Sequence, residues 1–474
     1  MRTSRLKLRN SGRSSSRSKL QGGHLHYTSG LGAGDRVTVV GLGKIGLPVA
    51  THIASAGFLI TGLDSSREVV QRVNAGEAGH VREPHLEKNL KRVVESGFLR
   101  ATSDYGVAIP EAKVIIVLIP LLVDNAGVPN FENYDQAVAS MGGVITPGTL
   151  IVFETTLPIG TTRSRFKLAL ERESGLEEGR DFWVAFSPER VSSGSILADL
   201  TAYPKIVGGI SEEAALRAKD FYEKALFAWP EITSSTSASP RPPVVLMESA
   251  EAAEFVKLAE TTYRDVNIAL ANEFARSADE LGVSFRKIRD AANSQPFSHI
   301  HEAGISVGGH CIPVYPHFYL YSNPNARLVR EARALNDSMV DYAVSRLTSF
   351  LGELRGLNIL ILGVTYRPGV SETAFSGALV LRDKLLEAGA IPLASDPILS
   401  AGEIENLGFQ PSFQDGEVDA IVLHTAHPDF EDLRPTQFSR LKAVVDGRRQ
   451  LVREVWESRD VRLHSLGDQS ESPA

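Results

Sequence analysis

The chain of 474 residues contains only one cysteine, Cys311, and this scarcity excludes several classes of protein. A single thiol cannot form an intrachain disulfide or supply a cysteine-rich metal site, and it is compatible with a reducing compartment. No apolar run approaches the roughly eighteen residues that a membrane helix requires, because the best candidate, at 114–119, has the length of a strand. We therefore expect a cytoplasmic protein with no membrane partner.

Positive charge is also in short supply, since 57 acidic residues outnumber 50 basic ones and the net charge is −7. Proteins that bind nucleic acid carry a basic excess, so we expect no nucleic-acid partner. The exception is 1–34, which has seven Arg or Lys in its first twenty residues and no acidic residue. It lacks the apolar core of a secretory signal, and we predict a disordered basic tail or a start assigned too early. A second disordered tail is predicted at 466–474.

The sequence between these tails alternates between strand-like and helix-like segments. A β-branched run at 36–40 leads into a glycine-rich loop, helical spacing follows over 44–56, and a second strand is predicted at 58–64. A polar, proline-rich segment at 230–243 marks a boundary. We expect a doubly wound parallel sheet that includes further strands at 114–119, 150–153 and 182–185.

One long helix is predicted at 248–281, because these 34 residues contain no Pro or Gly and carry apolar residues at helical spacing. Its length exceeds the globular norm, so we expect it to join domains or subunits. A second alternating region then has strands predicted at 358–364, 391–395, 420–424 and 443–445. The predicted fold class is therefore α/β, with two Rossmann-like doubly wound parallel-sheet domains joined by a long central helix.

The glycine-rich loop has the pattern of a dinucleotide site. It reads Gly41-Leu42-Gly43-Lys44-Ile45-Gly46, and its glycines allow a tight turn, close approach of the backbone to a pyrophosphate, and packing of the helix on the strand. Asp64 lies 18 residues after Gly46, at the end of the second strand. A carboxylate there accepts hydrogen bonds from the ribose hydroxyls and repels a 2′-phosphate. The loop, with Lys44 and Ile45, and Asp64 are therefore predicted to bind NAD rather than NADP.

Four later segments follow the loop in order. They read FETTLPIGTT at 153–162, SPER at 187–190, EFVKL at 254–258 and VGGHCIP at 307–313. In this order and after such a loop, they resemble the UDP-glucose/GDP-mannose dehydrogenase family, and the resemblance extends from Arg36 to about Arg462. Residues 264–273 resemble the branch of the family that acts on UDP-N-acetylhexosamines such as UDP-N-acetylmannosamine.

The resemblance implies a chemistry that the residue types explain. Members of the family oxidise C6 of the sugar twice, from alcohol to acid, reducing two NAD and passing through a cysteine thiohemiacetal and thioester. Cys311 matches the nucleophile, Lys257 matches the ammonium that stabilises oxyanions, and Glu189 matches the acid or base of thioester hydrolysis. Thr156 matches a threonine that helps to position water and cofactor, which makes it both a catalytic and a cofactor-binding candidate.

The resemblance also implies substrate-binding residues and domain boundaries. The two glycines before Cys311 leave room for a ligand to approach the backbone. The substrate-binding candidates are Glu189, Arg190, Lys257, Arg264, Gly308, Gly309 and Arg367. The predicted domains are an NAD-binding Rossmann domain at 35–245, a central helical region for dimerisation that includes the cysteine at 246–335, and a UDP-sugar-binding α/β domain at 336–465. We expect a homodimer or a larger homo-oligomer, because the long helix exposes apolar surface.

Two residues near the predicted nucleophile depart from the family pattern. Thr261 stands where the family usually has asparagine, and Tyr315 stands where it usually has aspartate. Those two groups ordinarily hold the catalytic water and take its proton. Loss of the carboxylate puts base catalysis at this site in question, and His310 and Asp265 are the candidates to replace it.

The predicted nucleotide-binding segment, 365–376, departs at two further positions. Arg367 replaces a usual lysine, which keeps a positive charge for phosphate, whereas Ala374 replaces a usual arginine, which removes a bidentate donor. Downstream, His424 and His427 lie three residues apart, but no cysteine or carboxylate spacing supports a metal site. We interpret these histidines as part of a structural loop at a strand end and predict no bound metal.

These observations favour an NAD-dependent nucleotide-sugar 6-dehydrogenase that forms a uronic acid for a surface polysaccharide or a glycosylated metabolite. The sugar nucleotide is then a UDP-N-acetylhexosamine such as UDP-N-acetylmannosamine, or UDP-glucose. Two alternatives stay open. One is a two-electron dehydrogenase that stops at the aldehyde because hydrolysis is impaired, and the other is a catalytically silent protein that binds NAD and a nucleotide sugar.

Overall fold

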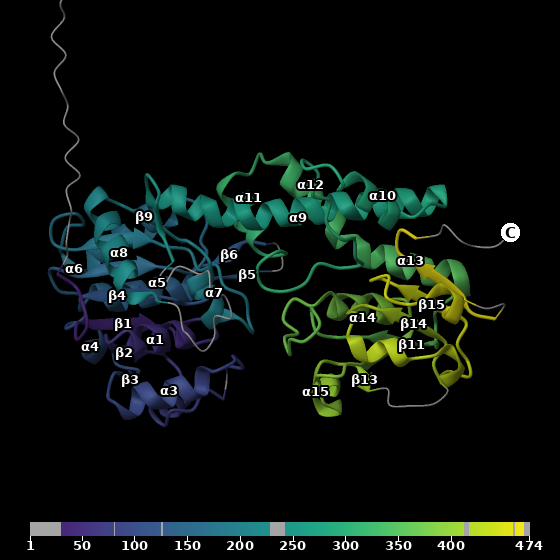
Figure 1. Ribbon diagram of the computed structural model, residues 1–474, viewed down its shortest axis with the longest axis horizontal. Coiled ribbons are helices and arrows are strands. Elements are labelled where there is room, and N and C mark those ends of the chain that lie inside the picture. The colour runs from purple at the N-terminus through teal and green to yellow at the C-terminus, as the bar shows by residue number, and fades with distance from the viewer. Residues whose placement is uncertain are drawn as a thin grey trace, which may run out of the picture.

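The structure is a computed structural model that describes residues 30–79, 81–124, 127–227, 242–411, 417–457 and 460–468. The predicted basic tail at 1–34 and the predicted tail at 466–474 fall mostly outside these residues, as does most of the proline-rich segment at 230–243. The described chain forms two α/β halves, one of them blue and purple and the other green and yellow in Figure 1.

The N-terminal half is built on an eight-stranded sheet with the order β10-β9-β8-β7-β4-β1-β2-β3. All of its neighbouring strands are parallel except β8 and β9, which run antiparallel, so the sheet departs at this one place from the predicted wholly parallel arrangement. The strands are β1 (Arg36–Val40), β2 (Leu59–Leu63), β3 (Leu99–Thr102), β4 (Val114–Val117), β7 (Leu150–Phe153), β8 (Trp183–Phe186), β9 (Lys205–Gly209) and β10 (Val244–Leu246).

Both faces of this sheet are covered because its strands are apolar on both sides. Val39 belongs to one buried cluster and its neighbour Val40 to the other, as the alternation of side chains along a strand requires. The helices that cover the faces or follow the strands are α1 (Gly46–Ser55), α2 (Arg67–Asn74), α3 (Leu86–Glu95), α5 (Glu132–Gly142), α6 (Leu168–Ser174), α7 (Ile196–Ala202) and α8 (Glu212–Ala225).

The C-terminal half contains a six-stranded sheet with the order β13-β12-β11-β14-β15-β16, in which every pair of neighbours is parallel. This order repeats that of the first six strands of the N-terminal sheet, β3-β2-β1-β4-β7-β8. The predicted fold class is confirmed. The strands are β11 (Asn358–Leu362), β12 (Ile391–Ser395), β13 (Gln410–Pro411), β14 (Ala420–Leu423), β15 (Ala443–Asp446) and β16 (Arg462–Ser465).

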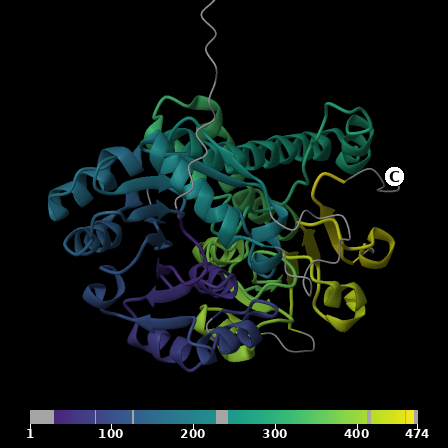
Figure 2. The ribbon, with the colours of Figure 1, turned by 60° about the vertical axis from the view of Figure 1, so that its left-hand side comes forward.

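Helix α9 (Ala250–Leu281) joins the two halves and runs above both sheets in Figure 1, and the turned view in Figure 2 agrees. Ser249 caps its N-terminus by accepting a hydrogen bond from the backbone N–H of Ala252, and Gly282 ends it in the left-handed conformation. The helix has 32 residues, two fewer than predicted. Its early residues belong to the N-terminal core and its late residues to the C-terminal core, so one helix is part of both.

The remaining elements connect these parts. The C-terminal sheet packs with α13 (Met339–Leu351), α14 (Gly377–Glu387) and α15 (Ala401–Asn406), while α10 (Phe285–Ala292), α11 (Tyr315–Ser322) and α12 (Arg327–Asp337) lie along α9. Shorter elements are α4 (Tyr105–Ala108), β5 (Leu122–Val123), β6 (Pro129–Asn130), the π-helix η1 (Thr162–Lys167), η2 (Pro428–Asp432), η3 (Pro435–Gln437) and α16 (Arg453–Trp456). Across the described ranges, no helix combines the length and apolar character needed to cross a bilayer.

Candidate active site

The glycine-rich loop lies between β1 and α1, and its three glycines are used in different ways. Gly41 has φ of +92°, and a Cβ there would lie 2.8 Å from the carbonyl oxygen of Leu118. A Cβ on Gly46 would lie 1.8 Å from the carbonyl oxygen of Gly41, so this position tolerates no side chain. Gly43 has no atom within 4 Å of its Cβ direction. The loop is therefore tightly packed at both ends and open in the middle, which fits the approach of a pyrophosphate.

Asp64 follows β2 and points back to this loop. Its carboxylate accepts hydrogen bonds from the backbone N–H of Leu42 at 2.8 Å and of Ser66 at 2.9 Å. Ile45 packs against the N-terminal core, whereas the half-exposed Lys44 pairs with Glu372 from the C-terminal half. The predicted NAD-binding residues thus gather at the carboxyl edge of the N-terminal sheet, where a Rossmann fold holds its dinucleotide.

Cys311 and Tyr315 lie one helical turn apart at the start of α11. The backbone N–H of Tyr315 donates to the carbonyl of Cys311 at 2.9 Å, and the Tyr315 hydroxyl faces the side chains of Cys311 and Thr156. Burial and the neighbouring Cys311 raise the pKa of Tyr315 well above its ordinary value, so the phenol stays protonated. Where the family has a carboxylate base, this chain therefore has a neutral hydrogen-bond donor.

The Lys257 ammonium comes to the same place from α9. Its side chain is buried, and its Nζ lies 5.9 Å from the centre of the Tyr315 ring. One turn later, the Thr261 hydroxyl donates to the carbonyl of Lys257 at 3.0 Å. The Thr261 hydroxyl therefore makes its one donated hydrogen bond inside α9. The structure brings four sequence-predicted residues of interest together here: Cys311, Lys257, Thr156 and Tyr315.

Glu189 lies after β8 and is part of a buried ionic cluster. Its carboxylate contacts the Lys205 ammonium at 3.2 Å, and the same ammonium lies 3.1 Å from Glu154. The Tyr222 hydroxyl donates to the other oxygen of Glu154. Burial raises the pKa of Glu154 to about 7. Burial alone would also raise the pKa of Glu189, but Lys205 holds it below its ordinary value.

Two predicted substrate-binding residues and one candidate replacement base have other partners or are exposed. Arg190 pairs with Glu260 of α9 at 2.9 Å, and Arg264 is exposed on the same helix. Asp265, a candidate replacement base, is buried against Arg333 and accepts a hydrogen bond from Asn336 at 2.8 Å. The Asp265 carboxylate is thus engaged by α12, and burial raises its pKa to about 6.

Gly308 and Gly309 face the C-terminal half. A Cβ on Gly308 would lie 2.8 Å from the Cβ of Tyr366, and one on Gly309 would lie 3.0 Å from the Tyr366 ring. Gly309 also has φ of +91°, a conformation that favours glycine. We predicted that these glycines leave room for a ligand, but Tyr366 occupies the space beside them.

The segment that carries Tyr366 reaches across to the NAD-binding half. Arg367 donates to the carbonyl of Ser193 at 2.6 Å, and Glu372 contacts His310 at 3.6 Å in addition to Lys44. A pocket of about 240 Å³ lies at this junction. Its lining comes from both halves and includes Lys44, Arg82, Glu83, Ser193, Ser371 and Glu372.

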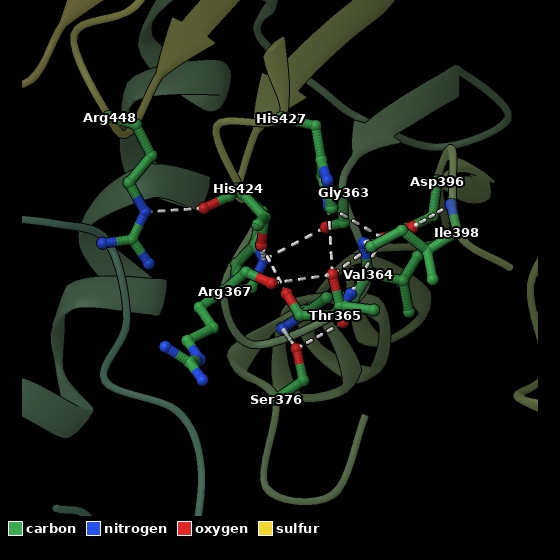
Figure 3. Close-up of polar contacts among 12 residues, drawn as sticks. Gly363, Val364, Thr365, Arg367, Ser376, Asp396, Ile398, His424, His427 and Arg448 are labelled. Carbon is green, nitrogen blue, oxygen red and sulfur yellow. Dashed lines mark hydrogen bonds and ion pairs between the residues drawn. The ribbon is translucent and has the colours of Figure 1, made fainter. Parts of the chain in front are cut away.

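His424 and His427, the two histidines predicted to lie in a loop at a strand end, are buried in a hydrogen-bond network (Figure 3). The ring of His424 contacts the Ser306 hydroxyl at 2.8 Å, and that of His427 contacts the Thr365 hydroxyl at 3.0 Å. Asp396 follows β12 and accepts from the backbone N–H groups of Val364 and Thr365. Among the residues that the structure describes, no cluster of His, Cys, Asp and Glu has the form of a metal site.

Sequence reasoning missed three charged residues of this region, Lys205, Glu154 and Arg448. The half-buried Arg448 donates to the carbonyl of His424 at 2.7 Å, and desolvation lowers its pKa to about 10. Its side chain and that of Arg367 extend to the same side of the network in Figure 3. The signal available for Lys205 was a lysine at the start of an apolar strand, which by itself indicates only a strand end.

Comparison with known proteins agrees with this arrangement. The chain matches three models of the UDP-glucose/GDP-mannose dehydrogenase family: the NAD binding domain at 35–226, the central domain at 251–338 and the UDP binding domain at 360–453. A UDP-N-acetyl-D-mannosamine dehydrogenase of Pyrococcus horikoshii is 35% identical over 427 residues, covering 87% of this chain and 95% of that protein. An NDP-N-acetyl-D-galactosaminuronic acid dehydrogenase of Ralstonia solanacearum is 31% identical over 425 residues, with coverage of 87% and 95%.

Solved structures show the same likeness. A UDP-N-acetylmannosamine dehydrogenase from Pyrococcus horikoshii superposes with a TM-score of 0.79 at 31% identity, covering 92% of this chain and 100% of that one. A UDP-glucose dehydrogenase from Pyrobaculum islandicum has a TM-score of 0.78 at 26% identity, with coverage of 92% and 98%. The class that fold and site define is an NAD-dependent dehydrogenase of nucleotide sugars, as the sequence predicted.

Within that class, the chain belongs to the UDP-glucose/GDP-mannose dehydrogenase family. NAD is its cofactor, and the prediction from the glycine-rich loop is confirmed. Its substrate is a nucleotide sugar, which it oxidises with NAD.

The glycine-rich loop generates a test with a matched pair of variants. Gly43→Ala should leave the thermal unfolding midpoint near that of the wild type, because its methyl group meets no protein atom within 4 Å. It should weaken NAD binding by at least about tenfold, because the methyl group occupies the space of the pyrophosphate. Gly46→Ala should lower the midpoint itself, since its Cβ collides with the backbone of Gly41. Scanning fluorimetry and calorimetric titration with NAD measure both, and wild-type affinity in Gly43→Ala would contradict the assignment.

Proposed function

We propose that the protein oxidises C6 of a UDP-sugar to the uronic acid in two hydride transfers to NAD. The substrate class is a UDP-N-acetylhexosamine such as UDP-N-acetylmannosamine, with UDP-glucose as the second candidate. The predicted domains supply its parts: 35–245 holds NAD, 246–335 brings the cysteine and 336–465 holds the UDP-sugar. The observation that carries the proposal is the meeting of Cys311, Lys257 and Thr156 at one point between the two halves.

Each of these residues has a definite task in the proposal. Bound NAD would supply the hydride acceptor for C6, and Lys257 stabilises negative charge on the C6 oxygen during each oxidation. Cys311 adds to the aldehyde, which holds it for the second oxidation and leaves a thioester. Thr156 positions the cofactor and the hydrolytic water, and Glu189 serves as acid or base when the thioester is hydrolysed. Asp64 binds the adenosine ribose, and Arg367 contributes charge near the diphosphate.

The stoichiometry of the reaction tests this function. The purified protein with NAD and a panel of UDP-sugars should form two NADH for each uronate, because the cysteine retains the aldehyde between the two steps. Absorbance and mass spectrometry of the same reaction measure both products. Cys311→Ala should form no uronate. A constant ratio of one NADH to one free aldehyde would instead establish a two-electron dehydrogenase, and NAD binding with no NADH from any sugar would favour a silent binding protein.

The residues around Cys311 also bear on the rate of thioester hydrolysis, the last step of the proposed reaction. Capture of the aldehyde requires the thiol and an oxyanion partner, whereas release of the acid requires an activated water. At the position of the usual carboxylate, the neutral Tyr315 hydroxyl faces Cys311 and Thr156, and the Thr261 hydroxyl is held by its own helix. We propose that hydrolysis is slower than the hydride steps in this protein.

Under that proposal, the Cys311 thioester should accumulate during turnover. A general base contributes about 10²–10⁴-fold, so its loss should leave the adduct visible in the intact-protein mass after a rapid quench. Tyr315→Asp should reduce the adduct and raise kcat, while Glu189→Gln should increase the adduct. A wild-type protein with no adduct and a fast second phase would mean that another residue supplies the base, with His310 the first to test.

The exposed side of α9 supports a proposal about assembly. Tyr263, Leu270, Phe274 and Leu281 are between 40% and 75% exposed and lie on one face of the helix at spacings of seven, four and seven. A continuous apolar stripe of this kind is costly to leave in water. We propose that a second copy of the chain covers it and that the enzyme is at least a homodimer in the cytoplasm.

Light scattering should therefore report a dimer or a larger assembly at micromolar concentration. Replacing both Leu270 and Phe274 by Glu should give a folded monomer, because two charges would face the partner. Val380→Glu is the matched control, since Val380 is equally exposed but lies on α14. A wild-type monomer, or an assembly that the double variant leaves intact, would contradict the proposal.

A further inference from the structure

The buried cluster around Glu189 contains more acid than base. Glu154 and Glu189 share one cation, Lys205, whose ammonium lies 3.1 Å from the first and 3.2 Å from the second. The side chains of Glu154, Lys205 and Glu189 are 1%, 8% and 12% exposed. Two ionised carboxylates beside a single ammonium would leave one negative charge without compensation in a site that excludes water. The cluster is therefore expected to hold one extra proton.

The surroundings decide which carboxyl group holds that proton. Glu189 receives a hydrogen bond from Lys205 and another from the backbone N–H of Arg190 at 2.7 Å, and both favour its ionised form. Glu154 is the more deeply buried carboxyl, and the negative charge of Glu189 beside it disfavours its ionised form. In agreement, burial raises the pKa of Glu154 to about 7, while Lys205 keeps the pKa of Glu189 below its usual range.

The other groups beside Glu189 and Glu154 are neutral or direct their charge elsewhere. His52 of α1 is fully buried, and burial lowers its pKa to about 3, so it carries no charge near neutral pH. Tyr222 of α8 donates to Glu154, and burial raises its pKa well above the ordinary value. Arg190 directs its guanidinium to Glu260 on α9. Lys205 is thus the cation that sets the charge of Glu189.

We propose that Lys205 is a positioning residue for the reaction, one that holds Glu189 in place as an anion while Glu154 keeps the single proton of the pair. The inference rests on the proposed role of Glu189 in the proposed function. It adds that this role depends on two residues that do not touch the substrate. Glu189 stays ionised, and so available as a base, only while Lys205 is beside it. Glu154, the neighbouring carboxyl group, stays protonated and neutral.

Steady-state kinetics across pH separates this role from a merely structural one. Lys205→Met should move the acid limb of the kcat profile upward by about 1–3 pH units, because Glu189 loses the opposite charge that favours ionisation. KM for the UDP-sugar should change little. Lys205→Arg should restore the wild-type limb, since it keeps the charge. Glu154→Gln should leave the limb in place or move it downward, because a neutral neighbour cannot repel the Glu189 carboxylate.

A matched control comes from a second buried ion pair outside the cluster. Arg333 of α12 pairs with Asp265 of α9, and both are buried. Arg333→Met should lower the unfolding midpoint, as Lys205→Met should, without moving the acid limb. A limb that stays in place in Lys205→Met, or that moves equally in Arg333→Met, would overturn the proposal.

Infrared spectroscopy tests whether Glu154 is protonated, and it requires no catalytic turnover. The ligand-free wild-type protein should show a protonated-carboxyl C=O band that fades as pH rises through about 7, and Glu154→Gln should remove it. Absence of that band would overturn the proposed proton on Glu154 even if the enzyme is active. Presence of the band in a protein that reduces no NAD with any UDP-sugar would count against the proposed function and leave the charge assignment standing.

Discussion

The buried polar face of α9 is the constraint on which the rest of the structure depends. Glu254, Lys257, Thr261, Asp265 and Asn272 are all buried and are spaced so that they share one side of the helix. A polar group buried in this way is costly unless it finds a partner. Thr261 finds its partner within α9, whereas Glu254, Asp265 and Asn272 bond to other segments and hold them against the helix.

These partners are the segments that build the active site. Glu254 accepts from the backbone N–H groups of Gly160 and Thr162, in the turn after Thr156. Asn272 accepts from the N–H of Gly304 at 2.8 Å, which tethers the segment leading to Cys311. Because the same helix contributes to both hydrophobic cores, the glycine-rich loop, the cysteine and the nucleotide segment are arranged around one rigid element.

The two halves share the same arrangement of a loop after the first strand and an acid after the second. In each, a glycine follows the first strand, and an acid after the second strand accepts from the backbone of that glycine loop: Asp64 from Leu42 and Asp396 from Val364. The shared strand order explains this, because the carboxyl ends of parallel strands meet at one edge. The glycine directly after the first strand of the C-terminal half is closely packed, since a Cβ on Gly363 would lie 2.5 Å from the Cβ of Thr425.

The sequence alone determined the features that arise from neighbouring residues. The central strands of both sheets, the glycine-rich loop, Asp64 and the long helix were predictable because each is set by spacing along the chain, whereas β3, β9, β10, β13 and β16 were not predicted. The family resemblance then supplied Cys311, Lys257, Glu189 and Thr156 as candidates. The antiparallel turn into β9 was not predictable, because strand direction depends on packing across the sheet.

Tertiary structure alone decided what the neighbours of those candidates are. Glu154, Glu189, Lys205 and Tyr222 come from four segments up to 68 residues apart, and nothing in their local sequence indicates that they meet. Burial alone would raise the pKa of Glu189, and a lysine on another strand holds it below its ordinary value; both effects are properties of the folded protein. The sequence likewise identified Tyr315 as a departure, but only folding placed its hydroxyl against Cys311 and Thr156, since proton transfer depends on distance in space and not along the chain.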